Sequence, residues 1–337
     1  MVGLGAVGRR TVNCLADDPT FDSVIVVHRD PRRMGPIVEG WGDRVEVRRG
    51  SVSDLPAADV TVVALASGQR RAASVAMANG SHVVCATDDP TEVRGLLGLD
   101  GKARTEGVTV AVGTVMAPGL SCVLAAHLRG RFEMVEEIHV ASFGTGGPAC
   151  ARRHHSALTS MAVDWEDGDW RRRPGGSGRE LVWFPDPVGG ADCYRAALVD
   201  PLLLVPAFPG CRRVTSRLEA TRRDRLTSWL PMLRAPHPEG LLGAVRVEVR
   251  GWVAGRAETQ ILGAALAPAV AAGAVTARAA VWAATGRLSR SGSAGLAELV
   301  PAPGPFLRDL ARDEISISSF EGQSGAFGDG TAAAGEF

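Results

Sequence analysis

The sequence has very little of two residue types on which some dehydrogenase sites depend. Among its 337 residues it contains one tyrosine, Tyr194, and one lysine, Lys102. The position four residues after Tyr194 is occupied by Leu198. A catalytic Tyr-x-x-x-Lys pair is therefore excluded, and any chemistry that needs a lysine has a single candidate.

Net charge, long apolar runs and clustered cysteines are also missing. Lys plus Arg and Asp plus Glu number 37 each, so no overall field attracts nucleic acid or an anionic membrane. No apolar run reaches the roughly 18 residues of a membrane span, and no segment has the pattern of a signal peptide. The six cysteines lack the paired spacing of a zinc site or a disulfide scaffold. We expect a cytoplasmic protein with no nucleic-acid or membrane partner.

What the sequence does contain is a regular alternation of strand and helix patterns in its first third. Short β-branched runs predict buried parallel strands at residues 24–27, 45–48, 60–64, 82–85 and 108–112. Helical patterns at 69–79 and 91–97 lie between them. This order predicts an α/β fold with a doubly wound Rossmann sheet.

The pattern changes after a proline-initiated helix predicted over residues 117–128. Strands are predicted at 135–143, 180–184 and 245–253, and helices at 157–165, 262–272, 276–284 and 306–312. Gly273 and Gly286 are expected to end two of these helices. We predict a dinucleotide-binding domain over residues 1–118, completed by a late helix within 290–320. An α+β substrate and dimerisation domain over 119–289 and a disordered tail over 323–337 are also predicted.

The opening MVGLGAVGRR carries the GxGxxG spacing at Gly3, Gly5 and Gly8. This spacing lets a strand turn sharply into a helix whose first N–H groups, around Ala6 and Val7, face a pyrophosphate. Only two residues precede the turn, so we expect part of the first strand to lie upstream of this sequence. The turn predicts dinucleotide binding.

The residues after the second strand indicate which dinucleotide is bound. An acidic residue there would bind the ribose 2′-hydroxyl, but the strand runs VIVVHRDPRR, with His28 and Arg29 at its tip and Arg32 and Arg33 nearby. A guanidinium pairs with phosphate, which favours NADP(H) over NAD(H). A small shift in register would instead make Asp30 the acidic ligand.

Ligands of a doubly wound sheet sit outside the carboxyl ends of its strands. By this rule the cofactor and substrate should meet the residues that follow four predicted strands: Asp54, Ala66, Ser67, Thr87, Gly113 and Met116. Asp54 fits a place beside the adenine or a helix cap equally well, and Ser67 and Thr87 also fit capping roles. Asp88 and Asp89 precede Pro90 and are explained by a helix start.

The segment CARRHHSALTS concentrates basic residues before a predicted helix. His154 or His155 could supply the proton that reduction of a C=N bond needs, and Arg152 and Arg153 could hold a substrate carboxylate. A solvated basic turn is the alternative. Adjacent histidines point apart on a helix and lack a spaced carboxylate, so no metal site is expected.

These motifs together resemble the saccharopine dehydrogenase-like superfamily, which includes saccharopine reductases and lysine 6-dehydrogenases. The resemblance spans nearly the whole chain. It rests on the order of six segments: GLGAVG, HVVCATD, GTVMAPGLSCVLA, FPDPVG, DPLLL and VTARAAVWAATG. It implies a nucleotide-binding domain, an α+β domain for substrate and dimerisation, and a late helix that packs back on the first domain.

The resemblance also implies reversible hydride transfer between NAD(P) and a carbon that bears an amine or imine. The sequence thus predicts an NADP(H)-dependent oxidoreductase of a small amino acid-derived substrate, acting as a homodimer. Two alternatives remain open at this point: an enoyl or carbonyl reductase of a larger apolar substrate, and a dinucleotide-binding regulator without turnover.

Overall fold

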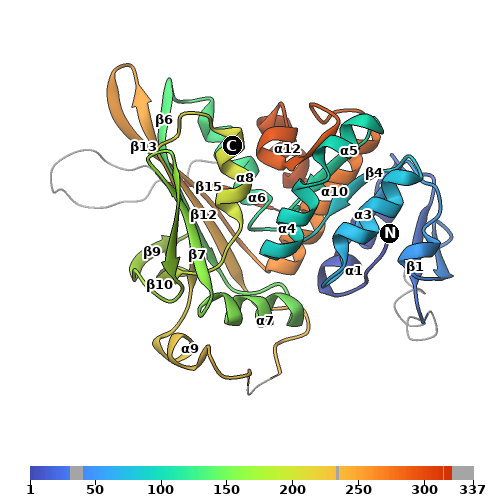
Figure 1. Cartoon of the computed structure of the whole chain (residues 1–337), viewed down its shortest axis with the longest axis horizontal. Coiled ribbons are helices and arrows are strands. Elements are labelled where there is room, and N and C mark those ends of the chain that lie inside the picture. Colours follow the sequence, from blue (N-terminus) through green and yellow to red (C-terminus); the bar gives the residue numbers. More distant parts are fainter. Residues whose placement is uncertain (31–40, 233–234, 314, 321–337) are drawn as a thin grey trace.

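The computed structural model describes residues 1–30, 41–232, 235–313 and 315–320. Two β-sheets stand side by side with helices packed between and around them (Figure 1). Within the described residues, no helix is both long enough and apolar enough to cross a bilayer.

The first sheet is entirely parallel and contains the predicted strands. Its strands are β1 (Val24–His28), β2 (Val45–Arg49), β3 (Val60–Val63), β4 (His82–Cys85), β5 (Thr109–Val112) and β14 (Gly292–Gly295). Val2 forms parallel bridges to both Val27 and Val63, so it joins the β1–β2 pair to the other four strands. The spatial order is β2, β1, Val2, β3, β4, β5, β14, which is the doubly wound order with one added strand.

Helices cover this sheet because its strands are apolar on both sides. The helices are α1 (Ala6–Asp17), α3 (Gln69–Ala78), α4 (Pro90–Leu97), α5 (Asp100–Thr105) and α10 (Pro268–Ala284). α10 packs along α1 and also contacts β3 and β4. A helix that follows the second sheet in the sequence thereby covers the first.

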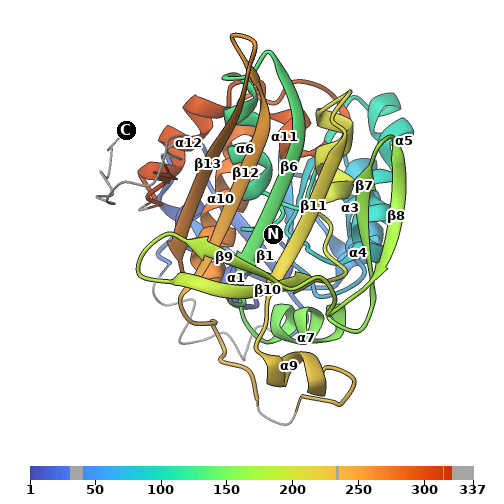
Figure 2. The ribbon, with the colours of Figure 1, turned by 90° about the vertical axis from the view of Figure 1, so that its left-hand side faces the viewer.

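The second sheet is mixed and has nine strands. They are β6 (Met134–Phe143), β7 (Met161–Glu166), β8 (Asp169–Pro174), β9 (Glu180–Phe184), β10 (Gly189–Arg195), β11 (Arg213–Glu219), β12 (Gly243–Val253), β13 (Arg256–Leu266) and β15 (Ser318–Phe320). Only the β6–β11 pairing is parallel. Figure 2 looks onto one face of this sheet, with the β9–β10 hairpin crossing the lower part of the long strands.

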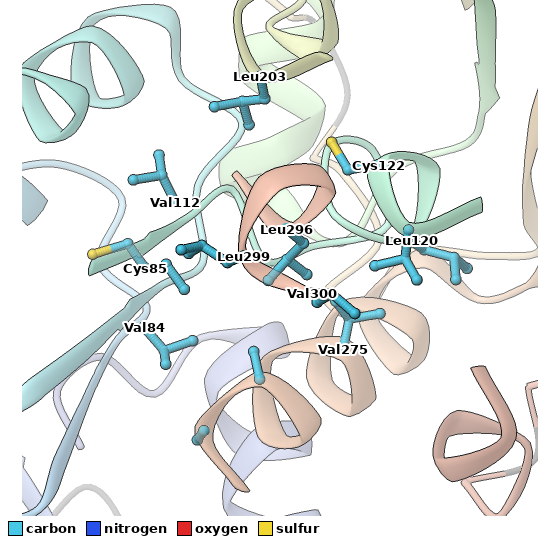
Figure 3. Packing of buried hydrophobic residues seen from close by; sticks show 14 of the residues in the cluster. Val84, Cys85, Val112, Leu120, Cys122, Leu203, Val275, Leu296, Leu299 and Val300 are labelled. Atoms are coloured by element: carbon cyan, nitrogen blue, oxygen red, sulfur yellow. The ribbon is translucent and has the colours of Figure 1, made fainter. Parts of the chain in front are cut away.

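One continuous hydrophobic core fills the space between the two sheets. It is built by α6 (Leu120–Arg129), α8 (Asp200–Leu204), α11 (Leu296–Leu299), α12 (Pro303–Ala311) and α10. Figure 3 shows Leu120 and Val275 beside Leu296 and Val300, near Val84 of the first sheet. α6 packs on β12, α11 and α12 at once, so the two sheets are held as one body.

The predicted fold class is confirmed: a Rossmann-like parallel sheet is followed by a mixed sheet with helices. The chain leaves the first sheet after β5, close to the boundary that we predicted at residue 118, and returns to it as β14. The late helices α11 and α12 fall within the predicted 290–320 segment, but α10 provides most of the packing on α1. The predicted tail over 323–337 lies outside the described residues.

Two predicted elements are wrong. Residues 157–165 are not a helix, because α7 (Pro148–Ala157) ends there and β7 begins at Met161. Residues 262–266 end the strand β13, and Gly273 lies inside α10 instead of ending a helix. A run of alanines shows neither the helical nor the strand period of apolar residues. The sequence pattern therefore could not indicate that β13 ends and α10 begins near Pro268.

Close packing of two helices explains a glycine in the middle of α10. A Cβ on Gly273 would lie 3.0 Å from the carbonyl carbon of Arg10 and 3.1 Å from the amide nitrogen of Thr11 on α1. Those backbone atoms cannot turn away as a side chain would. Gly273 therefore sets how closely α1 and α10 approach.

We expect Gly273→Ala to lower the free energy of unfolding by up to about 2 kcal/mol. Crowding in a packed core costs about 1–3 kcal/mol, more than the ~1 kcal/mol that alanine gains over glycine in a helix. The matched control is Gly101→Ala in α5, where no atom lies within 4 Å of the added Cβ and stability should be equal or higher. Urea unfolding measures both changes, and a stabilised Gly273→Ala variant would contradict the packing argument.

Candidate active site

The glycine-rich turn has the shape that a pyrophosphate requires. A Cβ on Gly8 would collide with the carbonyl oxygen of Gly3, and one on Gly3 would collide with the carbonyl group of Ala64. Gly5 has nothing within 4 Å of its Cβ position and is exposed at the start of α1. The outer glycines thus allow tight packing, and the middle one leaves open space above the helix end.

The first turn of α1 is free to bind an anion. Gly5 is its N-cap and supplies no side chain to cap the N–H groups, and no acidic residue lies in the first turn. The amides of Ala6, Val7 and Gly8 therefore have no partner within the helix. Together with the helix dipole they favour a negatively charged group at this point. The residues present fit a dinucleotide.

The residues predicted for the adenosine half of the cofactor lie at the tips of β1 and β2. His28 Nδ1 accepts a 3.1 Å hydrogen bond from the Asp30 amide, and the Arg29 side chain is exposed. The carboxylate of Asp54 accepts hydrogen bonds from the backbone N–H and the hydroxyl of Ser51. Asp54 is thus the third helical residue of a capping box whose N-cap is Ser51. Arg32 and Arg33 lie outside the described residues.

The residues predicted from strand ends do gather at one edge of the sheet. Ala66 and Ser67 are exposed after β3, whereas Thr87 is buried after β4. The Thr87 hydroxyl accepts a hydrogen bond of 3.1 Å from the Asp89 amide. Ser67 does not cap α3, whose N-cap is Gly68. Thr87 is a turn-forming residue, and Ser67 is available to a ligand.

Helix α7 carries residues of the second sheet's domain to this edge. Its N-cap, Gly147, lies so close to α1 that a Cβ there would be 3.0 Å from Cβ of Ala6. Pro148 at the first helical position starts the helix without needing a backbone donor. Figure 1 shows α7 near the end of the molecule at which α1 begins. The CARRHHSA segment is therefore helical, and the helix that carries it begins beside the glycine-rich turn.

Three side chains of α7 converge on one carboxylate after β4. Arg153 forms an ion pair with Asp88, contacting Oδ1. His154 Nε2 lies 3.5 Å from Asp88 Oδ2 and 3.5 Å from the sulfur of Cys150, one helical turn earlier. Asp88 is 8% exposed and His154 is 13% exposed. We name these four residues, Asp88, Cys150, Arg153 and His154, the α7 cluster.

Mutual charge fixes the protonation states in this cluster. Burial by itself would raise the pKa of Asp88, but hydrogen bonding to His154 and the charge of Arg153 hold that pKa well below its usual range. Burial would likewise lower the pKa of His154, yet Cys150 and Asp88 raise it to about 10. At neutral pH the cluster thus contains a carboxylate and an imidazolium.

The cluster separates two cavities of different character. A small cavity of about 60 Å³ lies on the side of the glycine-rich turn, where Val7, Ala86 and Met116 contribute to its lining. A larger one of about 970 Å³ lies between α4 and the β7–β8 hairpin, and its lining includes Arg94 and Arg172. Asp88, Arg153 and His154 line both cavities.

Of the four basic residues predicted in this segment, the structure brings two into the site. Arg152 is exposed and lines neither cavity, and His155 Nε2 is bonded at 2.8 Å to the carbonyl oxygen of Leu230. Sequence reasoning missed Cys150 as a site residue, and it offered two explanations for Asp88, a place at the end of its strand in the cofactor cleft and a helix start. The helix cap is in fact Asp89, whose carboxylate accepts from the Thr91 and Glu92 amides.

No protein-family model and no curated protein matches the sequence. In structure, the chain resembles apo saccharopine dehydrogenase (L-Glu forming) from Saccharomyces cerevisiae, with a TM-score of 0.70 at 14% identity over 95% of this chain and 99% of that one. A DAP dehydrogenase from C. glutamicum gives a TM-score of 0.47 at 16% identity, over 92% and 97%. The chain therefore shares the fold of saccharopine dehydrogenase, as its sequence motifs predict.

We expect Asp88→Asn to lower the pKa of His154 well below 10, because the variant removes the carboxylate that favours the imidazolium. NMR titration of the His154 ring in metal-free protein measures it. The control is Asp89→Asn, which removes the same charge one residue away at the α4 cap and should leave the His154 pKa near 10. An unchanged pKa in Asp88→Asn would contradict the arrangement of the cluster.

The same pKa predicts how stability depends on pH. A folded-state pKa above the ordinary value of about 6.5 means that protonated His154 stabilises the fold. This contribution should be complete below about pH 6.5 and disappear as the pH rises through about 10. Unfolding free energies measured across this range should fall more steeply in the unaltered protein than in His154→Gln.

Proposed function

We propose that this protein is an NADP(H)-dependent oxidoreductase that transfers hydride to or from the amine- or imine-bearing carbon of a small amino acid-derived substrate. The observation that carries the proposal is the meeting of the open glycine-rich turn with the α7 cluster, where Cβ of Ala6 nearly touches the N-cap of α7. A nicotinamide dinucleotide, when bound, supplies or accepts the hydride. The protein contributes position, charge and a proton.

The cofactor roles follow from the turn and the strand tips. Gly3, Gly5 and Gly8 shape the site for the pyrophosphate, and the first amides of α1 bind its oxygens. Arg29, exposed at the end of β1, binds the 2′-phosphate that distinguishes NADP(H) from NAD(H). The small cavity beside Val7 and Met116 receives the reacting carbon.

His154 is the proton donor in this proposal. Its Nε2 lies between Asp88 Oδ2 and Cys150 Sγ, at 3.5 Å from each, and the ring lines the small cavity. Asp88 positions the ring and favours its protonated form, and Arg153 holds the other carboxylate oxygen. A proton held at Nε2 can pass to the substrate nitrogen or, in the other direction, be taken from it.

The lining of the larger cavity supports one further part of the proposal, an anionic group on the substrate. Arg94 and Arg172 line it beside Arg153, so it presents three guanidinium groups of which only Arg153 is paired with Asp88. Guanidinium groups bind carboxylates in a bidentate way. A small anionic substrate fits this lining better than the broad apolar one that a lipid-like substrate would require. Arg152, exposed outside the cavity, is no longer part of the proposed substrate site.

The proposed assembly is a homodimer. Leu181 and Trp183 on β9 are 61% and 63% exposed, on a hairpin that crosses the long strands of the second sheet. Large apolar side chains in this position suit a surface that a second copy covers. The resemblance implies dimerisation through this domain.

We expect Arg29→Asp to weaken NADPH binding about 10- to 100-fold and NADH binding less than about 3-fold, because a charge-assisted hydrogen bond contributes about 1.5–3 kcal/mol. Fluorescence titration of both coenzymes measures the two constants. Arg223→Asp on the exposed helix α9 makes the same change in charge away from the turn and should alter neither. Equal losses for both coenzymes would remove the role of Arg29.

We expect His154→Ala to lower turnover by about 10²- to 10⁴-fold while NADPH affinity stays within about 2-fold, because the proton donor is lost and the cofactor site is not. Turnover is followed as NADPH oxidation with imines formed from 2-oxo acids and amines, in metal-free buffer. His155→Ala is the matched control, since it removes an imidazole bonded only to a loop carbonyl and should keep most activity.

Two results would contradict this proposal. Equal turnover in His154→Ala and the unaltered protein would remove the proton-donor role. Tight NADPH binding with no oxidation across the panel would favour a regulator over an enzyme.

A further inference from the structure

Three chemically different donor atoms converge within the α7 cluster. Asp88 offers a carboxylate oxygen, Cys150 a sulfur and His154 an imidazole nitrogen, and the three ligand atoms lie within 4.8 Å of one another. Two of the separations are given above: His154 Nε2 is 3.5 Å from each of the other two atoms. In the described part of the chain this is the one group of three such residues placed closely enough for a metal ion.

These separations match the edges of a zinc coordination tetrahedron. Zinc is bound at about 2.0–2.2 Å by nitrogen and oxygen and at about 2.3 Å by sulfur, which places neighbouring ligand atoms about 3.3–3.7 Å apart. The observed 3.5 Å falls inside that interval for both pairs. Two of the three ligand separations therefore already suit an ion, and the third, between Asp88 and Cys150, is below 4.8 Å.

The surroundings suit a metal with three protein ligands and one open position. Arg153 contacts Asp88 Oδ1 and so orients the carboxylate with Oδ2 toward the other ligands, as hydrogen bonds around a metal site commonly do. All three ligands also line the small cavity, which leaves room for a fourth ligand. A thiolate with an imidazole selects zinc and similar transition metals over Mg²⁺ and Ca²⁺.

We propose that Asp88, Cys150 and His154 bind one Zn²⁺ ion, and that its binding switches off the proton donor. In this exchange Zn²⁺ binds to the unprotonated Nε2 of His154, to Cys150 as the thiolate and to Asp88 as the carboxylate, and any proton carried by these atoms passes to solvent. No atom is oxidised or reduced. Nε2 cannot carry a proton and a metal at once, so the loaded protein lacks its acid. The proposal that Zn²⁺ binds does not depend on the proposed function. The proposal that bound Zn²⁺ inhibits the enzyme, called the inhibitory half below, rests on the proposed function.

The sequence argument against a metal considered only ligands spaced along one helix. Cys150 and His154 do lie one turn apart on α7, but the third ligand comes from the loop after β4 in the other sheet. Only the folded chain brings Asp88 to them.

Metal binding is tested first without reference to activity. Metal-free protein is titrated with Co²⁺, which reports a thiolate ligand by a charge-transfer absorption band, and with Zn²⁺ in equilibrium dialysis. We expect one ion per chain. Cys150→Ser, His154→Ala and Asp88→Asn should each weaken Zn²⁺ binding at least about 100-fold, beyond the 10- to 100-fold typical of changes around the ligands.

Matched controls separate the site from other cysteines and histidines. Cys14→Ser alters the other half-buried cysteine, and His155→Ala alters the neighbouring histidine; both should bind Zn²⁺ as the unaltered protein does. Should a ligand variant fail to fold, the unaltered protein still gives an answer. Zn²⁺ should protect Cys150 from alkylation by iodoacetamide, as read by peptide mapping, and leave Cys14 unprotected.

The outcomes distinguish the metal site from its inhibitory effect and from the proposed function. Absence of stoichiometric binding at micromolar Zn²⁺, or binding that survives both Cys150→Ser and His154→Ala, would overturn the metal site. If Zn²⁺ binds as expected but NADPH oxidation is unchanged or faster in the loaded protein, the inhibitory half is overturned. If no NADPH oxidation is found in any form, the proposed function and this inhibitory half fail together, and the binding measurements still decide the site.

Discussion

The buried carboxylate of Asp88 sets the arrangement around the candidate site. A charge removed from water is tolerated only where partners replace the lost hydration. Among the described residues, Asp88 is paired with Arg153 and His154, both of which lie on α7. The charge of Asp88 is thus balanced by side chains of α7, the helix that comes just before β7 of the second sheet. The two halves of the chain therefore meet at the carboxyl ends of the first sheet's strands, where such sheets bind ligands.

The core between the sheets makes this meeting reproducible. α6 packs on the second sheet and on α11 and α12, while α10 packs on α1 and on two strands of the first sheet. Gly273 lets α10 and α1 approach to backbone contact, and Gly147 lets the N-terminus of α7 approach the Ala6 side chain at the start of α1. Larger side chains at these two positions would push α10 and α7 away from α1. The small residues therefore fix the position of the glycine-rich turn relative to the α7 cluster.

Much of the first sheet was predictable because its signals are local. Runs such as VIVV and HVVC are short, apolar and bounded by turn residues, and the three glycines act over six positions. The second half was harder: the alanine-rich run hid the end of β13, and a stretch with mixed spacing was read as a helix where α7 ends and β7 begins. The site was predictable only in part. His154 and Arg153 stood out as a basic cluster, and the four-residue spacing of Cys150 and His154 was a readable signal once the segment was taken as a helix. The contact of Asp88 with them joins distant segments, which no spacing in the sequence reveals.

The position of Asp88, Arg153 and His154 on the lining of both cavities has a consequence for recognition. A molecule that occupies the two spaces together must lie across these side chains, with one end among guanidinium groups and the other in a compartment hardly larger than a few atoms. Arg94 and Arg172 line the larger space alone, so an anionic group meets more positive charge there than in the narrow space, and this difference favours one orientation of the molecule over its reverse.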